Sequence, residues 1–169
     1  SDDKTTLEAV RILRLLASHP DNPVRMGRDR SLIANLNRLL MDSDKPTKFD
    51  AVRTIAYLAV CEFNHTRLRE ESTLVANLNL LLMDSNSDTK YYSALAVARL
   101  ALCIDNQARL SEEPALFTNL NRLLMDSDIT TACFALSALA NLARYVDNHV
   151  TIAKLFIENI ALHIASTKL

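Results

Sequence analysis

The sequence predicts an all-α solenoid, and three observations indicate it. The nonapeptide NLNRLLMDS at 35–43 returns with one change at 77–85 and unchanged at 119–127, so the chain repeats every 42 residues. A period of roughly 40–47 residues is typical of helical solenoids. An aromatic content of 5% and a single glycine in 169 residues favour helices over strands and tight turns.

The period runs through the whole chain. One column, spaced by 42, holds Asn22, Asn64, Asn106 and Asn148, and another holds Ala59, Ala101 and Ala143. The segment 8–22 lies in register on 50–64. We expect one domain over 1–169 within a longer array, with a partial repeat at 1–21, complete repeats at 22–63, 64–105 and 106–147, and a partial repeat at 148–169.

Each complete repeat divides into three predicted helices. In the first they cover 24–29, 31–42 and 46–62, with a lone third helix at 4–18 before it and two helices over 148–167 at the other end. The prolines fall at the joints, as their missing N–H requires: Pro20, Pro23, Pro46 and Pro114, the last at the start of a second helix. The residue after each MDS is the predicted N-cap of a third helix, namely Asp44, Asn86 and Asp128.

Three segments of the third repeat resemble the armadillo-repeat family: DNQARL at 105–110, LNRLLMDSD at 120–128 and ALSALANLA at 135–143. The resemblance covers essentially the whole chain and implies a right-handed α-solenoid of about four armadillo-like repeats. The chain departs from the family at the glycine between the first two helices, where it has Arg30, Ser72 and Pro114.

Two asparagine columns are predicted to serve the architecture. Asn37, Asn79 and Asn121 lie among the leucines of the second helices, where stacking predicts a polar ladder from one unit to the next. The column that begins with Asn22 is expected to cap the short first helices.

The cysteines, histidines and paired glutamates, which could act in catalysis or bind a metal, do not cluster in the sequence. Cys61 and Cys103 share a column, so we expect them one repeat apart, beyond disulfide reach, as small buried residues. The four histidines are expected on the surface and show no metal-ligand spacing. The pairs Glu70–Glu71 and Glu112–Glu113 are placed in turns that face the N-terminus of a second helix. We therefore expect no enzyme, no cofactor and no metal.

The composition limits which classes of partner and which cellular compartment we expect for the protein. The formal charge of −1 argues against a uniformly basic nucleic-acid binder. The longest apolar run, at 55–61, is far shorter than the roughly 20 residues that span a bilayer, so no membrane insertion is expected. Three unpaired cysteines suit a reducing compartment, which predicts a cytoplasmic protein, with the nucleus as a second location.

The resemblance also places a peptide-binding groove along the concave side of the third helices. Aligned on ALSALANLA, one exposed position holds Arg11, Arg53, Leu95 and Ser137, and the position one turn later holds Leu15, Tyr57, Arg99 and Asn141. Family members like importin-α carry tryptophan and then asparagine there; this chain has no tryptophan and keeps only Asn141. Its arginines and tyrosines are closer to β-catenin-like grooves, which take extended, acidic and apolar segments.

The predicted function is therefore a scaffold that binds an extended protein segment. The expected contacts are Arg11, Arg53, Tyr57, Tyr91, Leu95, Arg99, Ser137, Asn141 and Arg144. A structural or regulatory spacer that self-associates end to end is the alternative. Nucleic-acid binding by a HEAT-like concave face is a third reading, disfavoured by the balanced charge.

Overall fold

The computed structural model of the protein describes residues 2–113 and 115–166, with side chains over 3–113 and 115–158. This part of the chain is helical and contains no strand, which confirms the all-α prediction. Its helices are α1 (Asp2–Ala17), α2 (Asn22–Met26), α3 (Arg30–Leu39), α4 (Lys45–Leu58), α5 (Glu62–Glu70), α6 (Leu74–Leu81), α7 (Ser87–Leu100), α8 (Ile104–Ser111), α9 (Leu116–Leu123), α10 (Ile129–Leu142), the 3₁₀ turn η1 (Val146–Asn148) and α11 (His149–Ser166). The predicted helix start at Pro114 lies outside the described residues.

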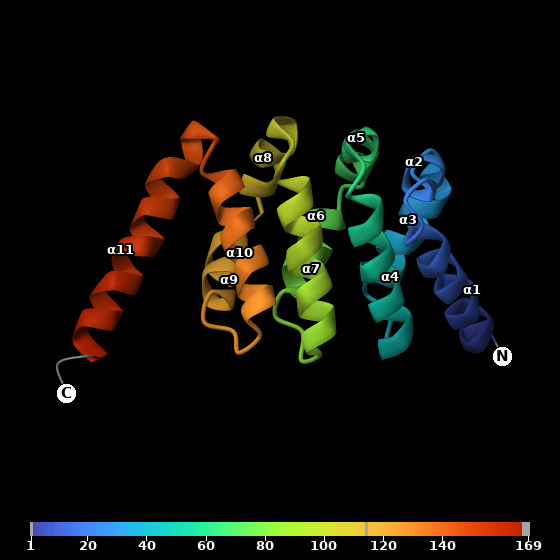
Figure 1. Ribbon diagram of the computed structural model, residues 1–169, viewed down its shortest axis with the longest axis horizontal. Coiled ribbons are helices and arrows are strands. Elements are labelled where there is room, and N and C mark those ends of the chain that lie inside the picture. The colour runs from blue at the N-terminus through green and yellow to red at the C-terminus, as the bar shows by residue number, and fades with distance from the viewer. Residues whose placement is uncertain (1, 114, 167–169) are drawn as a thin grey trace.

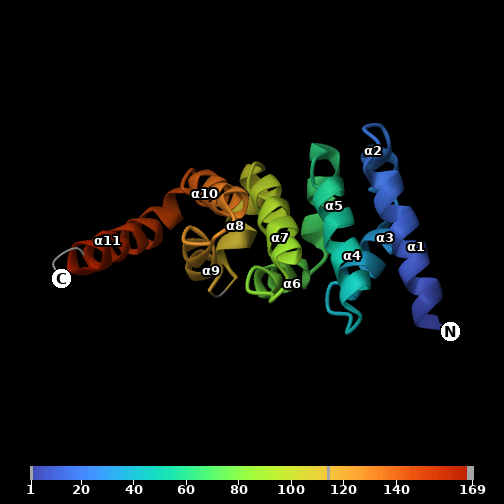
Figure 2. The ribbon, with the colours of Figure 1, turned by 60° about the horizontal axis from the view of Figure 1, so that its bottom comes forward.

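The third helices form the spine of the solenoid. Figure 1 shows α1, α4, α7 and α10 standing side by side in chain order, and each packs against the next. The first and second helices of each unit lie behind or beside this row (Figure 2). The predicted three-helix repeat is confirmed.

Helix ends in the first complete repeat fall earlier than predicted. Helix α4 ends at Leu58 because the next residues close a tight turn: the Val60 and Cys61 N–H groups bond to carbonyls only three residues back, those of Tyr57 and Leu58. Such bonds satisfy the carbonyls that an ending helix leaves free. The sequence pattern alone does not distinguish this turn from a further helical turn.

The C-terminal partial repeat differs from the prediction. Instead of two helices over 148–167, the chain forms the turn η1 and then one continuous helix, α11. Where other units have a polar break such as Arg28–Asp29–Arg30–Ser31, this unit has Lys-Leu-Phe-Ile at 154–157. These four residues all extend a helix without offering an N-cap, so the break is lost.

Small residues allow the third helices to approach one another. Thr54, Ala96 and Ala138 occupy one column and are fully buried. The equivalent residue on α1, Ile12, is 57% exposed, and the next turn's Leu16 is 47% exposed, because no unit of the described chain packs on that side. The outer face of α1 therefore exposes to solvent the positions that the other third helices bury.

The predicted N-caps of the third helices are confirmed. The side chains of Asp44 and Asn86 accept the N–H groups of Thr47 and Thr89 at 3.0 and 2.8 Å, and Asp128 accepts that of Thr131 at 2.9 Å. Each bond satisfies one of the N–H groups that a helix start leaves unpaired.

The asparagine column that begins with Asn22 serves a different helix end from the one predicted. The first helices begin after Asp21, Cys61 and Cys103, none of which makes a side-chain cap bond. Each asparagine instead donates its amide to the carbonyl six residues earlier, at 2.8–3.1 Å. The acceptors close the third helices: Leu16, Leu58, Leu100 and Leu142. The cap prediction is wrong because these carbonyls, at the ends of the packed third helices, need a partner in the turn.

A neighbouring column repeats this device. His65, Gln107 and His149 share hydrogen bonds of 2.9–3.0 Å with the carbonyls of Ala59, Ala101 and Ala143. His65 is only 3% exposed, so the surface prediction is wrong for it. Its ring fills the turn that links α4 to α5.

The cysteines also differ from expectation. Cys61 and Cys103 are free thiols, as expected, but both are partly exposed rather than buried. Each precedes a first helix, in the turn that leads out of the core.

The asparagines of the repeated nonapeptide form a ladder between units, as predicted, but their partners are side chains of other columns rather than asparagines of the same column or the loop backbone. Asn77 donates to the Asn37 side-chain oxygen at 2.9 Å, and Asn119 does the same to Asn79. Asn37 and Asn79 in turn donate forward, to Thr73 at 2.8 Å and to Glu113 at 3.0 Å. The nonapeptide therefore recurs because each copy bonds to the next.

Gly27 permits the close approach of two units. A Cβ at this position would meet the Asn64 Oδ1 at 1.9 Å, although the backbone φ of −68° suits any residue.

Gly27→Ala is expected to lower the free energy of unfolding by about 1–3 kcal/mol, because the Asn64 amide must move off its acceptors. Urea denaturation measures this change in the free energy of unfolding. In an Asn64→Ala background, Gly27→Ala should change that free energy little. An equal cost in both backgrounds would contradict the steric explanation.

The ladder predicts a difference between two residues of one column. Asn77→Ala should destabilise the protein by about 1 kcal/mol relative to Asn35→Ala, since Asn77 bonds to the preceding unit and exposed Asn35 has no such bond in the described chain. Both changes alter helix propensity equally, so denaturation midpoints compare the ladder bond alone. Equal midpoints would refute its contribution.

Candidate functional site

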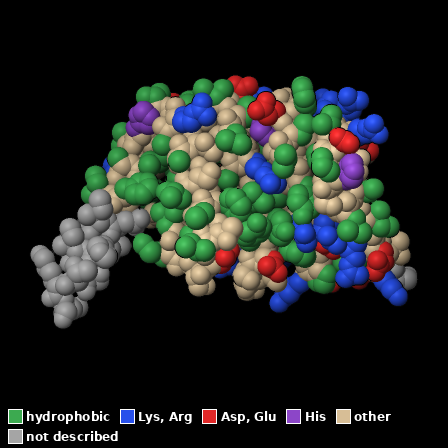
Figure 3. All heavy atoms as spheres, viewed as in Figure 1, with side chains coloured by type: hydrophobic (Ala, Val, Ile, Leu, Met, Phe, Trp, Pro, Cys, Tyr) green, Lys and Arg blue, Asp and Glu red, His purple; other side chains and the backbone are tan. Residues whose placement is uncertain are grey.

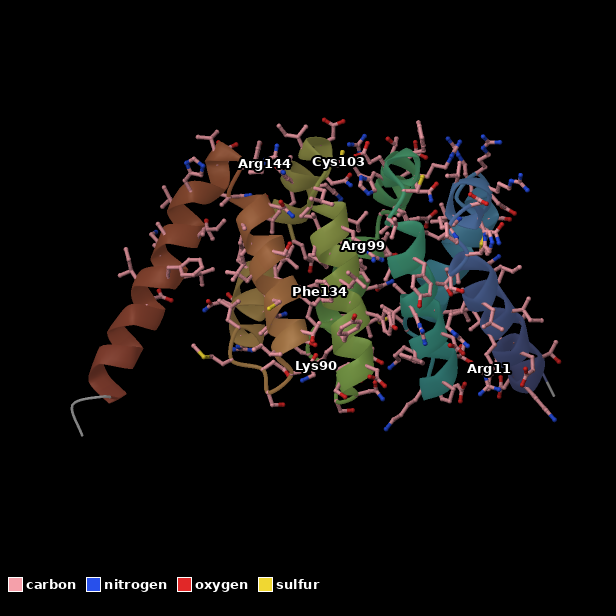
Figure 4. The ribbon with its side chains drawn as sticks, viewed as in Figure 1. Arg11, Lys90, Arg99, Cys103, Phe134 and Arg144 are labelled. Carbon is pink, nitrogen blue, oxygen red and sulfur yellow. The ribbon has the colours of Figure 1, made fainter. Side chains whose placement is uncertain are left out.

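The candidate site is the exposed surface of α1, α4, α7 and α10, which we call the third-helix face. Figure 1 looks onto it, and Figure 4 shows side chains projecting from it. Apolar side chains gather over its middle, around α7, in the space-filling view (Figure 3).

Aromatic rings join three of these helices. Tyr92 of α7 contacts Phe49 and Tyr57 of α4 edge to face, with ring centroids 5.8 and 6.3 Å apart. Tyr91 contacts Tyr92 at 4.8 Å and Phe134 of α10 at 5.3 Å. We call these five rings the aromatic strip. Edge-to-face pairs at such distances stabilise one another, so the strip is a preformed surface.

Arg53 lies within the aromatic strip. Its guanidinium carbon is 5.0 Å from the centroid of Tyr92 and 5.6 Å from that of Tyr57. Its Nε donates to the Tyr57 hydroxyl at 2.9 Å. Within the described chain, no hydrogen bond or ion pair occupies its two terminal nitrogens. The side chain is thus held in place while its fork remains available to a ligand.

The charge of Arg53 is secured by its surroundings. Partial burial lowers its pKa, but the hydrogen bond to Tyr57 and electrostatic interactions with Tyr92, Tyr57 and the Asp50 carboxylate outweigh burial, so the pKa lies above its ordinary value. Burial raises the pKa of Tyr92, although Arg53 opposes this. The cluster therefore presents the Arg53 cation beside a neutral Tyr92 phenol at neutral pH.

Two other predicted contact residues are turned toward the protein. Arg99 donates from Nη1 to the Ala56 carbonyl of the preceding third helix at 2.6 Å, and Asn141 donates to the Ala98 carbonyl at 3.5 Å. Both acceptors lie in the last turn of a helix, where cationic and amide donors are favourable. Burial lowers the pKa of Arg99. The third-helix position that holds Arg99 and Asn141 therefore links neighbouring units by hydrogen bonds as well as facing outward.

The remaining predicted residues are spread over the face. Arg11 is paired with Glu8 at 3.0 Å and approaches Asp50 at 3.7 Å. Ser137 and Arg144 are exposed, and Figure 4 shows Arg11 and Arg144 at opposite ends of the face. Leu95 is only 7% exposed and belongs to the core, so its predicted exposure is wrong. Its side chain is part of the hydrophobic core cluster, which leaves it little access to solvent.

Sequence reasoning missed Tyr92 and Phe134 as members of this site. They occupy one column, which holds Glu8 and Asp50 in the earlier units. The change from carboxylates to aromatic rings along that column was the available signal. Only the packing shows that these rings meet Tyr91 and Arg53.

The described residues include no group of three or more His, Cys, Asp or Glu side chains placed to hold a metal ion. No single helix in the described part of the chain is long and apolar enough to cross a membrane; α10 and Val146–Glu158 meet that standard only together, across a bend of 118°.

The fold has close structural neighbours. No protein-family model matches the sequence, and no curated protein matches it. An engineered protein superposes with a TM-score of 0.83 at 25% identity, over 92% of this chain and 38% of its own. A computationally designed armadillo repeat protein for modular peptide recognition gives 0.80 at 22%, over 88% and 63%, and a designed armadillo repeat protein in complex with the peptide (KR)4 gives 0.79 at 22%, over 88% and 62%. The chain thus spans less than two thirds of these neighbours' lengths, and its three-helix units form an armadillo-like repeat fold.

Proposed function

We propose that the protein is a non-enzymatic scaffold that binds an extended, acidic and apolar segment of a partner protein along the third-helix face. The observation that carries the proposal is Arg53, fixed among aromatic rings with its terminal nitrogens unoccupied. The armadillo-like fold supports it, because neighbours of this fold include a protein designed for peptide recognition. The cytoplasm or nucleus is its proposed location.

The chemistry of the site favours a carboxylate beside apolar side chains. A planar guanidinium offers parallel N–H donors that match a carboxylate, and charge-assisted bonds of this kind are about twice as strong as neutral ones. The aromatic strip next to it offers apolar area for the flanking residues of the segment.

The other predicted contact residues contribute to this proposal to different extents. Tyr57 and Tyr91 supply ring area, while Asn141 and Ser137 lie further along the same face for the segment's backbone. Arg99 is committed to the Ala56 carbonyl and Arg11 to carboxylates, so neither is the proposed anchor. Arg144 is exposed beyond α10, and we propose it only as a peripheral charge.

A peptide-display selection on the protein tests this function. We expect an enriched motif with an acidic residue beside apolar ones, and Arg53→Gln should weaken binding of the synthetic peptide by about tenfold through loss of a charge-assisted bond. Arg144→Gln, which removes the same charge at the edge of the face, is the matched control and should change affinity less than about twofold. Thermal unfolding of each variant verifies the fold.

Two results would reject the proposal. One is a motif rich in lysine or arginine; the other is an acidic motif that Arg53→Gln and Arg144→Gln weaken equally, because affinity would then depend on net charge rather than on the seated guanidinium.

End-to-end self-association is a second candidate, favoured by the exposed Ile12 and Leu16 on α1. These residues occupy columns that other units bury, so a further unit of another copy fits there. Light scattering over a wide concentration range should show growth that Leu16→Glu abolishes, because a carboxylate cannot be buried unpaired. A constant mass at all concentrations would eliminate this candidate.

A further inference from the structure

A second surface, separate from the third-helix face, forms a basic cleft between the first helices of two successive units. It lies between α2 and α5, which stand along the edge of the solenoid beyond the ends of α1 and α4 (Figure 1). The space-filling view shows basic side chains gathered at this edge, over α2 (Figure 3). The cleft has a volume of about 430 Å³, and the residues that matter in it are Arg28, Arg30, Phe63, Thr66, Arg67 and Glu70.

The cleft contains more guanidinium groups than it neutralises. Arg30 pairs with Glu70 at 3.4 Å. Arg67 uses one nitrogen to donate to the Gly27 carbonyl at 3.3 Å, which is a neutral partner. Arg28 is exposed and makes no ion pair in the described part of the chain. Two positive charges therefore remain uncompensated in one concave site.

The repeat provides an internal comparison, since the same positions recur 42 residues later. Arg28 becomes Glu70, Arg30 becomes Ser72, and Glu70 becomes Glu112. Arg67 becomes Arg109, which Glu112 neutralises at 3.1 Å. Three arginines and one glutamate are thus replaced by one arginine, one serine and two glutamates. The positive charge is a departure from the repeat, not a requirement of the fold.

Phe63 is a second departure at the same place. Its column otherwise holds Asp21, Asp105 and Asp147, all exposed, so the architecture accepts an aspartate there. Phe63 removes that carboxylate from the cleft and leaves its ring 79% exposed. An exposed ring beside uncompensated arginines provides an apolar contact next to an anion site.

We propose that this cleft binds a phosphorylated serine or threonine of a partner protein, with an apolar neighbouring residue against Phe63. A phosphate monoester carries nearly two negative charges at neutral pH and several strong acceptor oxygens, which matches the two uncompensated guanidinium groups better than a single carboxylate does. The proposal depends on Arg28 in the turn after α2 and on Phe63 and Arg67 of α5, and it is independent of Arg53 and the third-helix face.

The test uses the ¹⁵N-labelled protein and three probes: N-acetyl-Leu-phosphoserine-Leu-amide, the same peptide without phosphate, and inorganic phosphate. We expect saturable shifts of the Val24, Arg28 and Thr66 amides with the phosphopeptide, and binding at least about fivefold weaker with inorganic phosphate, since that ion makes no contact with Phe63. The unphosphorylated peptide should give no saturable shift.

Matched variants separate this site from general charge effects. Arg28→Gln should weaken phosphopeptide binding by about tenfold, whereas Arg25→Gln removes the same charge three residues earlier, on α2 and outside the cleft, and should change it less than about twofold. Phe63→Asp, which installs the residue of the other three units, should abolish binding with the fold intact. Arg53→Gln should have no effect here, so failure of this site and failure of the third-helix face are distinguishable.

Three outcomes would overturn the proposal: no saturable shift up to roughly 10 mM phosphopeptide, equal weakening by Arg28→Gln and Arg25→Gln, or equally tight binding of a single-stranded DNA oligonucleotide, which would identify a general polyanion surface.

Discussion

The solenoid depends on how each third helix is allowed to end. A helix that stops inside a packed stack leaves carbonyl groups without partners, and leaving them unpaired in a buried turn is costly. Here the amide of the residue six positions later pairs with the last carbonyl, as Asn64 does with Leu58. The next column, exemplified by His65 and Ala59, satisfies a second one. These bonds fix the sharp turn into the next unit, and that turn sets the spacing at which units stack.

Adjacent units then stack because their facing side chains are complementary in size and in hydrogen bonding. Small residues such as Ala96 allow third helices to touch, while Asn77 and Asn37 bond second helices across the unit boundary. Ion pairs join the same boundaries, with Lys48 at 3.6 Å from Asp84 and Lys90 at 2.5 Å from Asp126. Because each unit contacts mainly its neighbours, stability is distributed along the array, and single columns can vary without loss of the fold.

That freedom accounts for where the two proposed binding surfaces lie. Both occur where the chain departs from its own repeat: aromatic rings replace carboxylates at Tyr92 and Phe134, and Arg28 and Phe63 replace carboxylates on the first-helix edge. In each place a guanidinium retains free donors beside exposed ring area. Arginines in otherwise similar positions, such as Arg99 and Arg109, are occupied by the protein's own groups. An arginine's availability, more than its presence, therefore distinguishes a surface suited to ligands from one that serves the architecture.

The sequence by itself determined the helical class, the period, the three-helix unit, the N-caps at Asp44, Asn86 and Asp128, and the ladder of the nonapeptide. These follow from local propensity and from a translation of 42 residues, which places like residues beside like. Only the tertiary structure decided which carbonyl Asn64 satisfies, that 149–166 is one helix and that Leu95 is buried. It also decided that the terminal nitrogens of Arg53 stay available while Arg99 bonds to a backbone carbonyl. Those outcomes depend on which neighbouring group lies within hydrogen-bonding or van der Waals reach in three dimensions, and a column in a sequence alignment carries no information about that distance.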